Sequence, residues 1–268
     1  MTVRPPAVAG TFYEGRRDRL EADVRSFLPE DARPEPAIGA IVPHAGYVYS
    51  GPVAGAVYAR LEIPPAVIIL CPNHTGRGRP ASLDPSDAWR TPLGDAPVDR
   101  RLALRLLDLA SSLEEDSSAH AREHSLEVQL PFLQVRRPDV RFVPISIGAH
   151  NVDLCREIGE AVAEVVAEEK DRPLILASSD MSHYESRRIG REKDDRALAR
   201  VEALDPEGLY ATVMEGHITM CGILPATALL FAARKLGAAS ARVVARRDSG
   251  DETGDTSSVV GYAGVVVA

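Results

Sequence analysis

Apolar runs of strand length alternate with helical patterns along this chain, and this alternation constrains the fold more than any other feature of the sequence. Several of the runs lack the period-two pattern of a strand with one wet face, so we predict buried strands. The runs cover residues 37–43, 66–71, 141–148, 173–178, 241–246 and 258–268, and the helical patterns cover residues 153–169, 191–204 and 225–237. Gly237 is the expected C-cap of the last helix. Strand then helix, repeated, predicts the α/β class.

The sequence gives no sign of a domain boundary. With 268 residues, of which 45% are hydrophobic, the chain can bury a substantial core, and chains of this size commonly close as one unit. Stretches rich in serine, glycine and proline are short; the longest loop candidate covers residues 76–87, and no internal repeat is visible. We therefore predict a single domain over residues 1–268.

The charge and hydropathy patterns exclude several classes of partner. Lys and Arg total 31 against 39 Asp and Glu, which gives a net charge of −8, and the basic residues are scattered. This argues against a surface for nucleic acid or for anionic membranes. The N-terminal "MTVRPPAVAG" lacks the apolar segment of a signal peptide, and the longest apolar stretch, residues 259–268, is too short to span a bilayer. We expect a cytoplasmic protein.

The three cysteines have to be interpreted one by one. They are odd in number, widely separated and without a CxxC pair, so neither a disulfide framework nor a zinc ribbon is indicated. Cys71 and Cys155 are interpreted as small buried hydrophobic residues. Cys221, in "ITMCGILP", lies near a predicted helix N-terminus, where the helix dipole is expected to lower the pKa of a thiol.

Polar side chains with metal-binding or acid–base chemistry follow three of the predicted strands. His44 follows the first strand, His74 the second, and Asp180 and His183 the fourth. In open α/β sheets, ligands bind beyond the carboxyl ends of the strands. One such histidine could simply cap a turn, but three together favour a site.

Two neutral imidazoles at one sheet edge can bind a divalent metal, and a catalytic site generally needs a third protein ligand. The sequence offers four residues for that position, namely Cys221, Cys71, Asp180 and Glu127. Residue type and position alone leave this choice open.

Six motifs resemble the Memo family, whose bacterial and archaeal members are also called component B of the AmmeMemoRadiSam system. In order they are "AGTFYEG", "VPHAGYVYSG", "CPNHTG", "EHSLEVQLPFL", "SSDMSH" and "MCGILP", and the resemblance runs from about residue 7 to the end. It implies a fold like that of class III extradiol dioxygenases, with a central, mostly parallel or mixed sheet and helices on both faces. It also implies a radical-SAM protein and other proteins of the same system as partners.

Carried over by position, the resemblance implies His44, His74 and Cys221 as metal ligands, with Asp180 and His183 as a further active-site pair. Extradiol enzymes use two histidines and a carboxylate on Fe(II), and here a cysteine takes the carboxylate's place. A thiolate is a softer ligand that suits iron, copper(I) or zinc and is open to oxidation, which argues against catechol ring cleavage. The expected metal is Fe(II), with copper or zinc as alternatives.

Roles for the remaining residues around the site are hypotheses. His183 is expected to act as a general acid or base, and Asp180 either orients it, reaches a ligand or forms a turn. His124 and Glu127 are spaced to share one helix face, where they would support the ligands or a helix start. Tyr47 either lines the pocket or belongs to the core.

Four further residues have no assigned role in the chemistry. Phe12, where eukaryotic Memo members carry tryptophan, is expected to pack. His120, His150 and His217 fit no ligand pattern.

The candidate site is compatible with three alternative functions. The first is a metal-dependent redox enzyme, oxygenase-like, acting on a small molecule that the sequence does not identify. The second is a non-catalytic protein that binds a metal or a peptide with a vestigial site. A zinc-dependent hydrolase is the third, because two histidines, one cysteine and an open water position also suit zinc.

Overall fold

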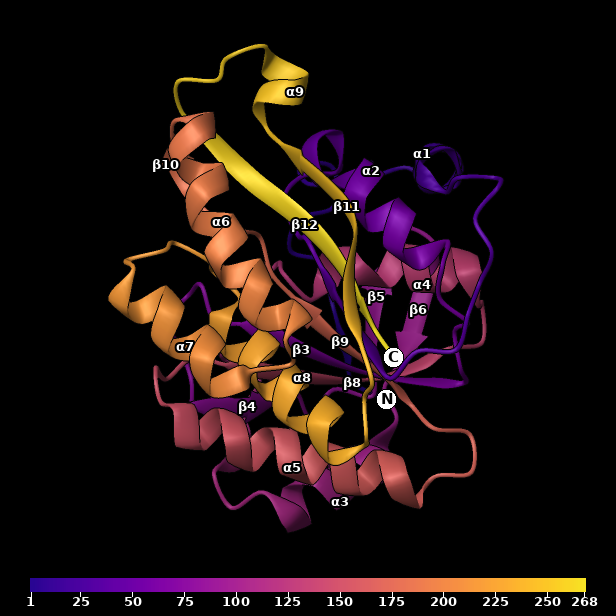
Figure 1. Ribbon diagram of the computed structural model, residues 1–268. Coiled ribbons are helices and arrows are strands. Elements are labelled where there is room, and N and C mark those ends of the chain that lie inside the picture. The colour runs from indigo at the N-terminus through magenta and orange to yellow at the C-terminus, as the bar shows by residue number, and fades with distance from the viewer.

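The computed structural model describes residues 1–268 and is built on one large mixed β-sheet (Figure 1). From edge to edge the strands run β10 (His183–Glu185), β12 (Val259–Val267), β2 (Gly39–Val42), β9 (Leu174–Ser178), β3 (Ala66–Pro72), β8 (Arg141–Ile147), β4 (Ala81–Leu83) and β7 (Leu113–Glu115), and β11 (Ala241–Asp248) pairs with β12. The four central strands β2, β9, β3 and β8 are parallel, whereas β12 and β4 run antiparallel to their neighbours in that group. The α/β fold expected from the alternation is therefore confirmed.

All six predicted runs form strands, but the prediction of a loop over residues 76–87 is wrong in part. Strand β4 lies inside this segment and pairs antiparallel with β8. Its three residues are too few to show a periodic pattern between the flanking glycine and proline residues. The pairing with the long strand β8 forms it.

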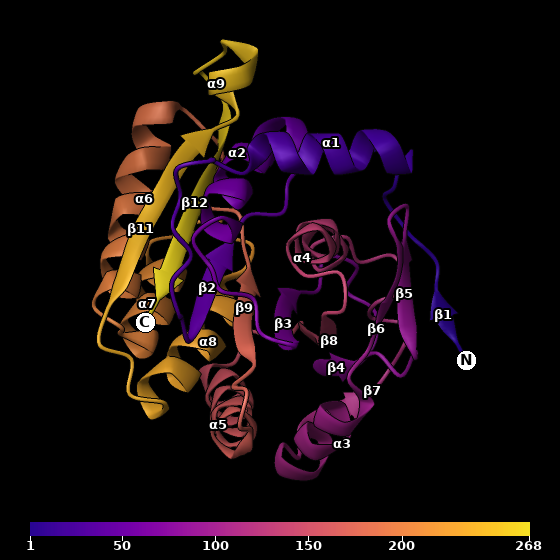
Figure 2. The same ribbon diagram turned by 90° about the vertical axis from the view of Figure 1, so that its right-hand side faces the viewer.

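Helices cover both faces of the sheet, and Figure 2 shows the two layers on either side of it. On one face lie α1 (Arg17–Phe27), α2 (Tyr47–Tyr58), a 3₁₀ turn (Glu127–Gln129), α4 (Leu130–Arg136) and a small sheet of β1 (Val3–Arg4), β5 (Ala88–Thr91) and β6 (Gly94–Pro97). On the other lie α3 (Arg100–Leu109), α5 (Val152–Glu168), α6 (Arg187–Glu202), α7 (Pro206–Glu215) and α8 (Ile223–Lys235). A short helix, α9 (Gly250–Thr253), lies between β11 and β12.

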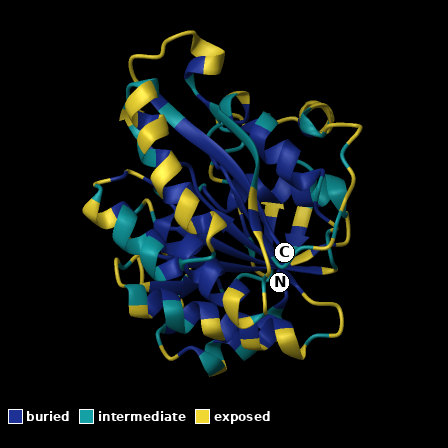
Figure 3. Ribbon diagram, in the orientation of Figure 1, coloured by how far each residue is buried: buried dark blue, intermediate teal, exposed yellow.

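Because successive side chains of a strand point to opposite faces, the sheet contributes residues to two separate cores, one on each face. Ile68 and Leu70 of β3 belong to a core of 45 buried residues with α5 and α8, whereas Val67 and Ile69 belong to one of 26 with α2 and α4. We call these the aliphatic core and the aromatic core. Burial on both faces explains the unbroken apolar runs, and β2, β3, β8, β9 and β12 are buried along most of their length (Figure 3).

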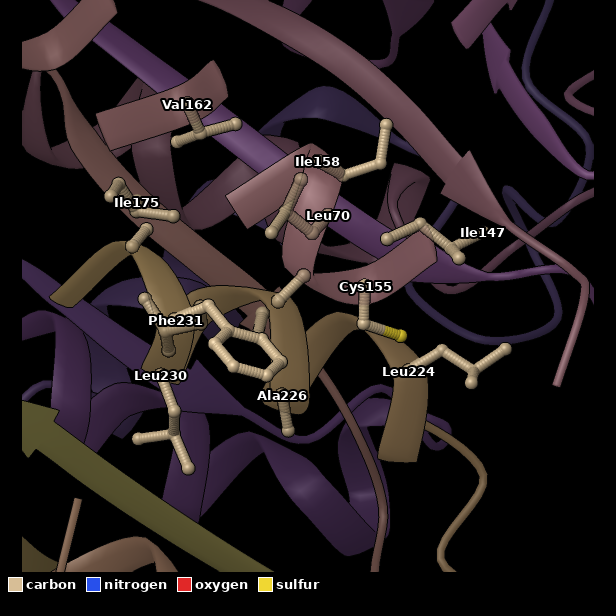
Figure 4. Close-up of a cluster of buried hydrophobic side chains, with 14 of the residues drawn as sticks. Leu70, Ile147, Cys155, Ile158, Val162, Ile175, Leu224, Ala226, Leu230 and Phe231 are labelled. Carbon is tan, nitrogen blue, oxygen red and sulfur yellow. The ribbon is translucent and has the colours of Figure 1, made fainter. Parts of the chain in front are cut away.

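The aliphatic core is closed mainly by α5 packing on α8 (Figure 4). Gly159 of α5 permits the close approach, since a Cβ there would lie 2.4 Å from the Ala228 carbonyl oxygen of α8. Cys155 is fully buried in this core, as Cys71 is in the aromatic core, so both cysteines pack as expected. Gly237 takes a positive φ of 83° directly after the C-cap of α8, where a residue with a side chain would be strained.

The helices that connect the parallel strands determine where in the sheet a ligand site can form. Helix α2 connects β2 to β3 across the aromatic face, and α5 connects β8 to β9 across the aliphatic face. The chain thus winds in both directions, and β9 lies between β2 and β3. Ligand crevices form where such windings separate, at the carboxyl ends of the strands. No helix of the protein has the length and apolar character needed to cross a membrane.

Candidate metal centre

His44, His74 and Cys221 converge at the carboxyl edge of the central strands. His44 follows β2, His74 follows β3, and Cys221 directly precedes Gly222, the N-cap of α8. Each offers one ligand atom, and the three atoms lie within 4.8 Å of one another. The Nε2 atom of His44 is 3.1 Å from the Cys221 sulfur. Of the four residues that the sequence left open as a third partner, Cys221 is the one that the fold brings to both histidines.

The hydrogen bonds of Ser178 fix the proton of His44. Strand β9 pairs in register with β2, and the Ser178 hydroxyl donates its single proton to the carbonyl oxygen of Ser125 at 2.6 Å. It therefore accepts at its other contacts, from Gln129 Nε2 at 3.0 Å and from His44 Nδ1 at 2.8 Å. The imidazole proton of His44 is thus on Nδ1. Its Nε2 lone pair faces Cys221.

Glu123 fixes the ring orientation of His74 and holds a proton on its Nδ1 atom. Its buried carboxylate accepts the His74 Nδ1–H at 2.8 Å and the His74 backbone N–H at 2.6 Å. Burial alone would raise the pKa of Glu123, but the hydrogen bonds from His74 and Ser125 outweigh it and hold the pKa at about 2. Burial also lowers the pKa of His74, and the hydrogen bond and charge of Glu123 reverse this to a net rise. Because Nδ1 of His74 is held by Glu123, Nε2 is the nitrogen that remains for a metal, which would take the place of any proton there.

The pKa of the Cys221 thiol is shifted in the direction opposite to the one expected from the sequence. Burial, followed by the Asp180 carboxylate, raises the pKa of its thiol well above the usual range, although the Asp180 backbone N–H donates to the sulfur at 3.2 Å. The expectation that the helix dipole lowers this pKa is wrong, because desolvation is the larger effect. A thiol in this position loses its proton when a cation coordinates the sulfur.

Asp180 holds the His44 loop rather than His183. One carboxylate oxygen accepts the backbone N–H of His44 at 2.7 Å, and burial raises the pKa of the carboxyl to about 6. His183 is oriented by Thr219, whose carbonyl oxygen is 2.8 Å from His183 Nδ1 and whose hydroxyl accepts the His183 backbone N–H at 2.7 Å. A carbonyl only accepts, so His183 also carries its proton on Nδ1. Asp180, His183 and Cys221 have their ligand atoms within 4.8 Å of one another.

The structure separates the His124–Glu127 pair. His124 stacks on His74 with ring centroids 4.7 Å apart and contacts His44 edge-on at 5.5 Å, and Phe12 packs against it at 4.6 Å. Glu127 instead forms a buried ion pair with Arg4, 2.6 Å long. Glu127 therefore ties the N-terminal segment to the aromatic core and contributes no hydrogen bond to the ligands.

Tyr47 belongs to the aromatic core. It is buried against Phe132 with ring centroids 5.0 Å apart, and its hydroxyl donates to the carbonyl oxygen of Val128 at 2.6 Å. Of the remaining histidines, His120 is fully buried and His217 is exposed. His150 lines a cavity together with His74 and Cys221.

Sequence reasoning missed the residues that orient the three histidines. Ser178, Glu123 and Thr219 are 134, 49 and 36 positions from their histidines, so no local spacing reveals these contacts. One signal was present for Glu123, which lies next to His124 in a motif that already stood out. An acidic residue next to a candidate histidine is a natural hydrogen-bond partner for the nitrogen that does not bind metal.

Comparisons with known proteins agree with this geometry. A family model described as "Memo-like protein" matches residues 4–266. A "MEMO1 family protein" of Methanosarcina acetivorans is 42% identical over 269 residues and covers all of both chains, and one of Aquifex aeolicus is 43% identical and covers 99% of each. A solved structure of an uncharacterized Escherichia coli K12 protein, JW3007, shares the fold with a TM-score of 0.51 at 19% identity, over 78% of this chain and 88% of that one.

The match spans the ligand candidates at the sheet edge and the elements that carry them. The chain belongs to the Memo family.

Proposed function

We propose that the protein binds Fe(II) through His44, His74 and Cys221 and acts as a redox enzyme on a small molecule. One observation carries this proposal: a ligand atom from each of His44, His74 and Cys221 lies within 4.8 Å of the other two, and hydrogen bonds to Nδ1 of both histidines leave Nε2 as the nitrogen available to a metal. Two neutral imidazoles and a thiol that can ionise are a donor set that suits iron, copper or zinc.

A three-ligand site leaves a coordination position for substrate or water, which is typical of catalytic rather than structural centres. When bound, the metal supplies a Lewis acid and a one-electron redox couple. His183, with a free Nε2 beside Cys221, is placed to take up or return a proton. Asp180 keeps His44 in place by accepting its backbone N–H.

The test is metal analysis of protein purified without oxygen and reconstituted separately with Fe(II), Cu(I) and Zn(II). We expect one equivalent of metal in the unmodified protein and in His150→Ala, a matched control that removes an exposed histidine of the adjoining cavity. His44→Ala, His74→Ala and Cys221→Ala should each lose most of it. If the unmodified protein bound none of the three metals at stoichiometric level, or if the variants bound as well as the control, the metal centre would be refuted.

A zinc-dependent hydrolase is the second candidate, because two histidines, one cysteine and an open position also suit zinc. Competition between Fe(II) and Zn(II), followed by oxygen uptake of the iron-loaded protein with small reductants, separates the two. Oxygen uptake that is lost in Cys221→Ala supports the redox enzyme. Preference for zinc without oxygen uptake supports the hydrolase, or the non-catalytic metal-binding protein if no ester or amide is cleaved either.

A further inference from the structure

A cavity of about 300 Å³ adjoins the candidate metal centre and shares two of its residues, His74 and Cys221. This volume lies at the lower end of the range of about 300–1,000 Å³ for ligand pockets. Its walls come from the end of β8, the end of α7, the start of α8 and the loop between these two helices. Anything bound there lies against the two ligand side chains.

The lining is mostly apolar and carries no acidic or basic side chain other than histidine. None of the 14 lining residues is Asp, Glu, Lys or Arg, although such residues make up 26% of the chain. The lining includes Ile147, Met220 and Leu224, which are all buried members of the aliphatic core. Figure 4 labels Ile147 and Leu224. A charged group placed against these walls would lose its hydration without gaining a partner.

The mouth is marked by exposed lining residues, among them His150, Thr219 and Met214 of α7, whose exposed fraction is 42%. Two of the polar side chains at the cavity are already engaged: Asn73 donates to the Arg77 carbonyl oxygen, and the Thr219 hydroxyl accepts the backbone N–H of His183. Few polar groups are left to bind the body of a ligand. Apart from His150 at the mouth, the side chains left to make polar contacts are those of His74 and Cys221.

We propose that this cavity binds the substrate, and that the substrate is a small uncharged molecule with an aliphatic body and a single oxygen-containing head that faces the metal. The head group rests on the proposed function, since it requires a metal at His74 and Cys221. The apolar body rests on the walls alone. The two parts can therefore be tested separately.

The first test uses the four methionines of the chain as probes. Met214 and Met220 line the cavity, whereas Met1 and Met181 do not. Protein without added metal, labelled with ¹³C at the methionine methyl groups, is titrated by NMR with butan-1-ol, hexan-1-ol and 6-aminohexan-1-ol. Burial of each methylene tightens binding about fourfold, so hexan-1-ol should bind roughly 15-fold more tightly than butan-1-ol.

Shifts should be confined to Met214 and Met220, and the charged amino alcohol should bind at least about tenfold more weakly than hexan-1-ol, because its ammonium group would be desolvated without a partner. Met214→Asp, at a half-exposed position, should weaken hexan-1-ol binding severalfold, as reported by Met220. Ile189→Asp, at an exposed position of α6 outside the cavity, is the matched control and should bind normally. Equal binding of all three alcohols, or shifts of Met1 and Met181 as large as those of Met214 and Met220, would overturn the proposal.

The second test adds the head group. Iron-loaded protein is titrated by calorimetry without oxygen with acetohydroxamic and hexanohydroxamic acids, which share a metal-binding head and differ in the length of the tail. Hexanohydroxamic acid should bind at least about tenfold more tightly. If iron binds but the tail makes no difference, the cavity proposal fails and the proposed function stands. If iron does not bind, the proposed function and the metal-facing head fail together, and the alcohol titration still decides on the apolar body.

Discussion

The two cores of the sheet differ in what they contain and in what they do for the site. The aliphatic core is built almost entirely from Ala, Val, Leu and Ile of the strands and of α3, α5, α6, α7 and α8. The aromatic core contains Tyr13, Tyr47, Tyr58, Trp89 and Phe132, and it buries charged and amide groups with them. The aliphatic core is held mainly by burial, whereas directed hydrogen bonds run through the aromatic core.

The directed hydrogen bonds of the aromatic core lead to both histidine ligands. Tyr58 donates to Gln129 at 2.9 Å, Gln129 donates to Ser178, and Ser178 accepts from His44. Along a second route, Arg4 donates to the carbonyl oxygen of Glu123 at 2.7 Å, and the Glu123 carboxylate accepts from His74. We infer that the aromatic core sets ligand geometry, whereas the aliphatic core supplies stability and positions Cys221 through α8.

The largest expected effect comes from breaking the buried ion pair of the aromatic core. Glu127→Gln leaves the Arg4 guanidinium without a counter-charge, and the loss of one partner of a buried pair costs about 3–5 kcal/mol. Urea unfolding measures the free energy of unfolding. The double variant Arg4→Met, Glu127→Gln should lose less than the single one, and a larger loss would contradict this account.

Truncation in the aliphatic core should affect stability without affecting metal binding. Ile158→Ala, at a buried position of α5, is expected to cost about 2–5 kcal/mol in the free energy of unfolding, because it leaves a cavity. Iron affinity, measured at a temperature where the variant remains folded, should change less than about twofold. A tenfold loss of affinity would remove the distinction between the two cores.

At Ser178 we expect the opposite result, a large loss of metal affinity with a small loss of stability. Ser178→Ala removes the acceptor that holds the proton of His44 on Nδ1, and the loss of such a supporting contact lowers metal affinity by about 10–100-fold. The effect on the free energy of unfolding should stay within about 1–3 kcal/mol. Ser146→Ala, which removes another buried hydroxyl from β8, is the control and should keep its metal affinity.

The smallest effect is expected one step further from the ligand. Tyr58→Phe removes only the hydroxyl that donates a hydrogen bond to Gln129. We expect this to cost about 1 kcal/mol in the free energy of unfolding. Metal affinity should fall by less than in Ser178→Ala. If both variants lost affinity equally, the route through Gln129 would act as one unit rather than step by step.

The sequence predicted the sheet well because most of its long strands are buried on both faces; β11, predicted as a buried strand, is instead mostly half-buried, because it lies outside β12. Strand β4 was missed, since three residues carry no period. The strand exits pointed to His44, His74 and His183, and the resemblance selected Cys221 to join the first two; whether these residues bind a metal stays a prediction. The roles of Glu123 and Thr219 depend on contacts between distant parts of the chain, and those contacts exist only once the strands are in register.

The separation of the donor atoms along the chain has a consequence for how the protein melts. His44 and Cys221 are 177 positions apart and belong to different sheet faces through their neighbouring helices. An unfolded chain rarely brings three such distant donors together, so a metal binds almost only the folded form and its binding energy adds to stability. A sample that holds less metal than protein should therefore melt as two populations, and the ratio of the two transitions should report the metal occupancy directly.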